Sequence, residues 1–142
     1  MSVGYSGTPL AAKLGIKSGC AVYVRDAPPL YKQLLAPLPL DVRFVHSPER
    51  ATVLHVFATE REELASHLKQ LRDRMPADAA LWISWPKKAS KVATTITEDT
   101  VRELALPLGL VDIKVCAVDA IWSGLKLVIR KELRPVQTRQ RT

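Results

Sequence analysis

Two short apolar runs on either side of an amphipathic stretch constrain the fold of this chain most. The runs are Thr52 to Ala58 and Ala80 to Trp85, and near-continuous runs of this length are typical of parallel strands covered on both faces. Between them, over residues 60–74, leucines recur at helical spacing among charged residues. The pattern therefore predicts a strand, a helix and a second, parallel strand.

The rest of the chain continues this alternation of strands and helices. We expect further helices at Pro9 to Leu14, about Pro29 to Leu35 and from Thr97 to before Pro107, and further strands at Cys20 to Arg25, Val42 to His46, Val111 to Val118 and from Ile121 or Trp122 to Arg130. Thr59 with Glu62 predicts a capping box, and Thr97 a second N-cap.

The last two predicted strands are joined by a short link. The turn is expected at Asp119-Ala120, with Ser123-Gly124 as the alternative for the turn or as a bulge. So short a link requires an antiparallel pair. The predicted fold is therefore an α/β three-layer sandwich. Its mainly parallel, Rossmann-like sheet has about six strands, with the last strand antiparallel and at an open edge.

The charge is distributed unevenly along this chain of 142 residues, which is about the size of one domain. Residues 130–142 carry five basic residues against one acid, and Lys87, Lys88 and Lys91 add three charges to the net +7. We expect one domain over residues 1–131 and a basic, flexible tail over 132–142. Because basic segments neutralise phosphates, the tail and these lysines make nucleic-acid binding one alternative function.

Several protein classes are disfavoured by the sequence. No apolar run approaches the roughly 20 residues that span a bilayer, and the N-terminal residues do not follow the signal-peptide pattern. Cys20 and Cys116 lie in strand-like runs without Cys or His at metal-ligand spacing, so we expect reduced core cysteines and no metal site. We expect a cytoplasmic protein.

The segment from Trp85 to Lys91 is the main candidate site. It places Lys87, Lys88, Ser90 and Lys91 after a predicted central strand, at the edge where open α/β sheets bind ligands. Ammonium groups bind anions as point charges, so we expect an anionic small molecule or a protein partner here. A solvated loop without a ligand is the alternative interpretation.

Other residues are placed by their position in the predicted elements. Trp85 could form the floor of a ligand pocket or stack on a base, whereas Trp82 is expected in the core. Asp26 and His46 follow strand ends and are expected to border the same cleft as the lysines. Among the remaining histidines, His55 is expected to be a hydrogen-bonded core residue and His67 to lie on an exposed helix face.

From Thr52 onward the chain resembles the second half of class I methyltransferases, in the runs 53–57, 79–84 and 108–113 and the final antiparallel pair. The resemblance implies a Rossmann-like fold and S-adenosylmethionine as a possible cofactor. Where that family has a glycine-rich turn, this chain has Arg25 to Pro29, and where it has an acid for the ribose hydroxyls this chain has His46-Ser47. It also has about one strand–helix unit fewer.

A second resemblance covers nearly the whole chain before the tail. The segments Gly4 to Leu10, Trp85 to Ser90 and Trp122 to Lys126 are similar to a small bacterial domain family of unknown function, which implies no activity. The sequence thus leaves three hypotheses. The first is a non-catalytic binding module with a methyltransferase-like fold. The alternatives are an atypical S-adenosylmethionine-dependent methyltransferase and a nucleic-acid-binding protein.

Overall fold

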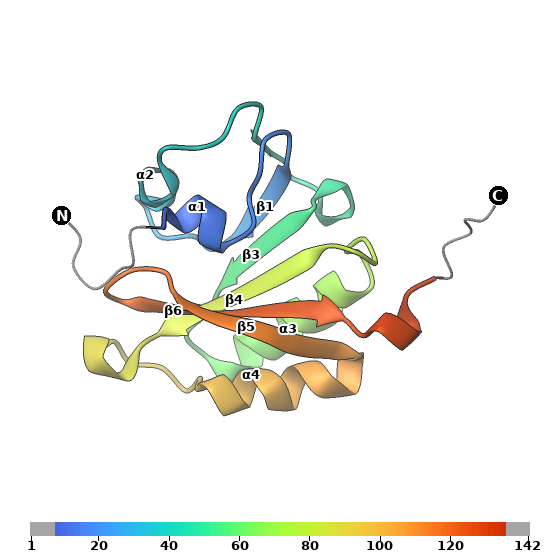
Figure 1. Cartoon of the computed structure of the whole chain (residues 1–142). Helices are drawn as coiled ribbons and strands as arrows, with labels where there is room; N and C mark the ends of the chain where they lie inside the picture. Colours follow the sequence, from blue (N-terminus) through green and yellow to red (C-terminus); the bar gives the residue numbers. More distant parts are fainter. Residues whose placement is uncertain (1–7, 136–142) are drawn as a thin grey trace.

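A six-stranded sheet with helices on both faces forms the structure, a computed structural model that describes residues 8–135. Figure 1 shows α1 and α2 on one side of the sheet and α3 and α4 on the other. The strands are β1 (Ala21–Arg25), β2 (Arg43–Phe44), β3 (Val53–Phe57), β4 (Ala80–Pro86), β5 (Leu110–Ala117) and β6 (Trp122–Ile129). The helices are α1 (Leu10–Lys13), α2 (Tyr31–Leu35), α3 (Arg61–Arg72) and α4 (Glu98–Ala105), with single-turn 3₁₀ helices at Pro48–Arg50, Lys88–Ser90, Leu106–Leu108 and Lys131–Leu133.

The strand order is β2-β1-β3-β4-β6-β5, and among the six described strands β6 runs opposite to the other five. The α/β fold and the antiparallel last strand are therefore confirmed. The expectation that this last strand forms the open edge is wrong, because β6 is inserted between β4 and β5. Leu125, Leu127 and Ile129 of β6 are buried, as an inner position requires, whereas β5 is largely exposed at the edge.

Each face of the sheet is covered by its own apolar core. On the α3 and α4 side, Leu54 and Val56 of β3 and Leu81 and Ile83 of β4 are fully buried. On the α1 and α2 side the core contains Phe57 and Trp82, together with leucines from both helices. Because both faces are covered, β3 and β4 read as continuous apolar runs in the sequence.

The predicted capping box at Thr59 and Glu62 is not formed. The α3 helix begins at Arg61, whose backbone N–H donates to Thr95 Oγ1 at 2.7 Å, while Glu63 accepts from the Thr59 backbone N–H at 3.2 Å. A distant hydroxyl therefore replaces the local cap. The predicted N-cap of α4 is confirmed, since Thr97 accepts from the Thr100 backbone N–H.

Two other local predictions change in the structure. The second strand shrinks from the expected 42–46 to Arg43–Phe44, because it is an edge strand that pairs with β1 alone. The turn between β5 and β6 lies at Asp119, whose Oδ1 accepts from the backbone N–H groups of Ile121 and Trp122 at 2.8 Å. The Ser123-Gly124 alternative is wrong, because both residues belong to β6 and pair in regular register with β4 and β5.

After β6 the chain packs back on the domain over the residues that are described. Arg134 Nε donates to the Ile129 carbonyl at 2.9 Å, and Leu133 lies against Gly109, which has a φ of +81°. Residues 136–142 of the predicted basic tail lie outside the described residues. None of the helices within residues 8–135 has the length and apolar character needed to cross a membrane.

Candidate functional site

The carboxyl ends of β1, β3 and β4 meet at one edge of the sheet, because these strands are parallel neighbours. The edge therefore collects Asp26 after β1, Thr59 after β3 and the segment from Lys87 to Lys91 after β4, which we call the lysine loop. The turn at Asp119, which follows β5, lies at the same edge because β5 runs in the direction of β4.

The lysine loop has a defined internal structure. The Lys87 backbone N–H donates to the Ile121 carbonyl at 2.7 Å, and Ser90 Oγ donates to the Lys87 carbonyl at 2.7 Å and accepts from the Val92 N–H at 3.2 Å. Lys91 adopts a left-handed conformation with φ 63°. Ser90, a predicted ligand contact, thus has its hydroxyl engaged within the loop.

The segment after the lysine loop is tied to the start of α3. Thr94 Oγ1 donates to the Thr59 carbonyl at 2.7 Å, and the Thr95 N–H donates to the same carbonyl. The long connection between β4 and α4 is therefore held against the sheet edge. These bonds do not involve the lysine side chains.

The lysine side chains themselves are open to solvent. Lys88 and Lys91 are exposed and Lys87 is half-buried. None of the three forms an ion pair with an acidic group among residues 8–135. Three ammonium groups without counter-charges in the described part of the chain are available to an anion.

The two tryptophans of β4 face opposite cores. Trp85 is only 6% exposed and packs in the core on the α3 and α4 side, so its ring face is not open to stack on a base. Trp82 is fully buried on the α1 and α2 side, as expected, and its Nε1–H donates to the Leu14 carbonyl at 2.9 Å.

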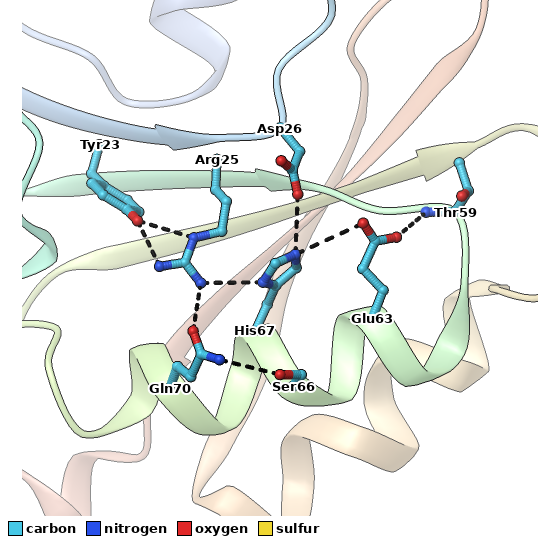
Figure 2. A network of polar contacts seen from close by, with 8 residues as sticks. All are labelled: Tyr23, Arg25, Asp26, Thr59, Glu63, Ser66, His67 and Gln70. Carbon is cyan, nitrogen blue, oxygen red and sulfur yellow. Dashed lines mark hydrogen bonds and ion pairs between the residues drawn. The ribbon is translucent and has the colours of Figure 1, made fainter.

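Asp26 belongs to a polar network between the end of β1 and α3, shown in Figure 2. Its Oδ2 accepts from His67 Nε2 at 3.2 Å, while Arg25 Nη1 donates to His67 Nδ1 at 3.1 Å. Arg25 also donates to the Tyr23 hydroxyl and to Gln70 Oε1. The predicted exposed position of His67 is therefore wrong: its side chain is 15% exposed and joins two elements.

Asp26, Glu63 and His67 place potential metal-ligand atoms within 4.8 Å of one another, although sequence spacing predicted no such set. An arginine side chain can only donate hydrogen bonds, so Nδ1 of His67 accepts from Arg25. In the neutral ring the proton is then on Nε2, the atom that faces the carboxylates of Asp26 and Glu63. A metal-bound imidazole has the opposite arrangement, with a lone pair toward the metal and an N–H toward an acceptor. The cluster therefore does not suit a metal ion while Arg25 is in place.

His46 lies in a different place from Asp26. It is exposed at the mouth of a cleft of about 460 Å³ between α2 and the strands β1 and β2, which we call the α2 cleft. The cleft is largely apolar, and the Lys32 ammonium group lies 4.6 Å above the Phe44 ring beside it. Asp26 points instead to α3, and neither Asp26 nor the lysine loop lines the α2 cleft.

The donor set at the ends of β1 and β2 does not fit S-adenosylmethionine as class I methyltransferases bind it. Pro28 and Pro29 have no N–H to offer in the turn after β1, and Asp26, at φ 60°, is tied to His67. No carboxylate lines the α2 cleft among its described residues, so the ribose hydroxyls would lack their usual acidic acceptor.

A buried polar relay lies beneath the α2 cleft. The Tyr31 hydroxyl is 2.8 Å from His55 Nδ1, and His55 Nε2 is 2.8 Å from Ser84 Oγ. Burial lowers the pKa of His55 to about 3 and raises the pKa of Tyr31. The predicted hydrogen-bonded core histidine is thus confirmed, and its inaccessibility excludes direct contact with a substrate.

The fold of the chain is Rossmann-like and is similar to that of solved methyltransferases. A S-adenosylmethionine-dependent methyltransferase from Aquifex aeolicus superimposes with a TM-score of 0.60 at 15% identity, covering 84% of this chain and 87% of that one. An O-methyltransferase from neocarzinostatin biosynthesis, in complex with S-adenosylmethionine and 2-hydroxy-5-methyl naphthoic acid, gives 0.60 at 11% identity over 78% of this chain and 49% of its own.

A protein of the NADB-Rossmann superfamily from Streptococcus agalactiae matches at a TM-score of 0.50 and 9% identity, over 92% of this chain and 71% of that one. No family model and no curated protein sequence matches this chain. At these identities the likeness shows the fold alone, and the resemblance to the small bacterial family stays a prediction.

Proposed function

We propose that this chain is a binding domain on a methyltransferase-like fold that holds an anionic small molecule at the lysine loop. One observation supports this most: Lys87, Lys88 and Lys91 lack acidic partners among the described residues, in a loop fixed at the carboxyl edge of the sheet. Open α/β sheets bind their ligands at this edge.

A second candidate function is an atypical S-adenosylmethionine-dependent methyltransferase. The structural neighbours that are methyltransferases favour it, as does the α2 cleft of about 460 Å³ beside the ends of β1 and β2. The volume is within the range of small-molecule sites. The prolines of the turn after β1 and the lack of an acid in the cleft count against it.

A thermal-unfolding series with S-adenosylhomocysteine, phosphate, pyrophosphate and a short oligonucleotide separates these functions. A ligand at 100 times its dissociation constant adds about 2.7 kcal/mol to the free energy of unfolding, which moves the midpoint by a few degrees. Stabilisation by the inorganic anions supports the binding domain, whereas stabilisation by S-adenosylhomocysteine alone supports the methyltransferase. Stabilisation by the oligonucleotide alone, lost steeply with salt, supports nucleic-acid binding.

Replacing Lys87 and Lys88 together by Ala is expected to abolish the stabilisation by anions. The unfolding midpoint without anion should stay nearly unchanged, because neither side chain has an acidic partner among the described residues. The matched control replaces Lys17 and Lys69, which are exposed elsewhere, and so removes the same charge. Equal anion stabilisation in both double variants would remove the lysine loop from the site.

A further inference from the structure

A second group of lysines faces a cleft between α1 and β5. This cleft, here called the β5 cleft, has a volume of about 380 Å³. It is lined by Thr8, Ala12, Lys13, Lys114, Val115, Cys116 and Ala117. Two of these residues are basic, and none of the described lining residues is acidic. The cleft lies on the face of the sheet that also carries Trp82, as the strand register shows.

The register of β5 and β6 brings a further lysine to this face. Lys114 pairs directly with Lys126 of β6, and Cys116 pairs with Gly124. A Cβ on Gly124 would meet Cys116 Sγ at 3.4 Å and the Trp82 ring at 3.3 Å, so these groups share one face. Because side chains alternate along a strand, Lys114 lies on the same face as Cys116.

Lys87 of the lysine loop lies outside the lining of this cleft but contributes positive charge to it. Its backbone is fixed beside the start of β6 by the bond to Ile121. The ammonium groups of Lys13, Lys114 and Lys87 all act on the Cys116 thiol: burial raises the pKa of Cys116, and the three positive charges oppose that rise. Segments from α1, the lysine loop and β5 therefore place positive charge around one sulfur atom.

This arrangement is unfavourable for the protein alone. Like charges directly opposite each other on neighbouring strands are destabilising. Neither Lys114 nor Lys126 forms an ion pair with an acid in the described part of the chain. A bound anion would supply the missing counter-charge to both lysines at once.

We infer that the β5 cleft binds the charged group of the ligand, and that this group is a phosphate or pyrophosphate held by Lys114, Lys126 and Lys87 over the Cys116 thiol. The inference rests on the proposed function for the existence of an anionic ligand, and it adds the place and the chemical class. Lysine is a common phosphate binder, and a group with two or more negative charges matches several converging ammonium groups. The cleft has a volume of about 380 Å³, which is within the range of small-molecule sites.

The Cys116 thiol offers a direct test, because it lies within the proposed site. A Cys20→Ser background leaves Cys116 as the only cysteine of the chain, and the serine hydroxyl retains an acceptor for the Lys17 N–H that Cys20 Sγ now accepts. The rate of Cys116 labelling by the uncharged reagent 4,4′-dithiodipyridine is then measured with and without pyrophosphate. We expect at least tenfold slower labelling with pyrophosphate, and no change with sodium chloride at equal ionic strength.

Two variants test the lysines. In the same background, Lys114→Gln with Lys126→Gln should weaken the protection by pyrophosphate at least tenfold in concentration, whereas Lys17→Gln with Lys69→Gln should leave it unchanged. The thermal midpoint of each variant shows whether it is folded. Because Lys114 is exposed and Lys126 half-buried, relief of their repulsion should keep the first variant at least as stable as the background protein.

The outcomes separate the inference from the proposed function. If anions stabilise the protein through Lys87 and Lys88 but do not protect Cys116, the β5 cleft is not the site and the proposed function stands. If no anion raises the unfolding midpoint, both are overturned. Protection by a short oligonucleotide but not by pyrophosphate would overturn the small-molecule class in favour of nucleic acid.

Discussion

Replacing Trp82 by Ala is expected to lower the free energy of unfolding by about 3–5 kcal/mol, the usual cost of removing a buried indole. Trp82 is 0% exposed, lies in the central strand β4 and packs in the core on the α1 and α2 side. Its ring lies close to Gly124, and its Nε1–H satisfies the carbonyl of Leu14, a residue at the end of α1. The substitution therefore leaves a cavity and an unsatisfied carbonyl together.

Trp82→Phe separates these two contributions. It retains a ring but loses the bond to Leu14, so we expect a smaller loss of about 1–3 kcal/mol, the cost of leaving a buried acceptor unpaired. Trp122→Ala, at a half-buried position, serves as the matched control and should cost less than Trp82→Ala. Urea denaturation followed by far-ultraviolet circular dichroism measures all three. Equal losses for Trp82→Ala and Trp122→Ala would contradict the assignment of Trp82 as a central core residue.

The parts of the fold that local patterns encode were predictable. The apolar runs around His55 and Trp82 indicated strands covered on both faces, and both residues are buried in β3 and β4. Thr97 marked the start of α4 because a hydroxyl cap needs only neighbouring backbone groups. The turn at Asp119 is likewise determined by one side chain and the residues that follow it.

Features that depend on distant segments were not predictable from one sequence. The insertion of β6 between β4 and β5 depends on which strands pair, and hydrophobic alternation does not specify that. The first backbone N–H of α3 donates to Thr95, 34 residues away. The local sequence at Thr59 therefore could not show which residue caps this helix. His67 looked exposed because its partners, Arg25 and Asp26, come from another strand.

The candidate site shows the same division. The lysine loop was visible as a cluster of charges after an apolar run, and its role in binding remains a prediction. Asp26 and His46 follow neighbouring strands but face different elements, so position along the chain did not show whether they meet. Cys116 was expected in the core but is half-buried, because β5 is an edge strand. The alternation of Lys114 and Cys116 was the available signal for the β5 cleft, but only the register with β6 shows that Lys126 joins them.

The stability of the protein is expected to fall between pH 7.5 and pH 5 because of His55. Burial lowers the pKa of His55 to about 3 in the folded protein, whereas an unfolded histidine has a pKa of about 6.5. Below about pH 6.5 the unfolded chain therefore binds a proton that the folded protein does not, which favours unfolding. At pH 5 this single group should lower the free energy of unfolding by about 2 kcal/mol, with further loss down to about pH 3.

This interval distinguishes His55 from the carboxylates. The pKa of Glu49 is lowered to about 2, chiefly by its hydrogen bond to Arg74. Its contribution to the stability of the folded protein is therefore lost only as the pH falls below the ordinary pKa of a glutamate, about 4. Urea titrations at pH 7.5, 6 and 5 compare the wild type with His55→Gln. The variant cannot titrate at this position. Between pH 7.5 and pH 5 its free energy of unfolding should therefore fall by about 2 kcal/mol less than that of the wild type.

His55→Gln will also be less stable at pH 7.5, because a glutamine does not reproduce both bonds of the imidazole to Tyr31 and Ser84. The difference in slope, and not the stability itself, therefore tests the prediction. A proton NMR titration of the wild type gives an independent measurement: one of its three histidine rings should keep its neutral chemical shift down to about pH 4. If all three rings titrate near pH 6.5 while the protein is folded, His55 is open to water and the buried relay with Tyr31 and Ser84 does not exist as described.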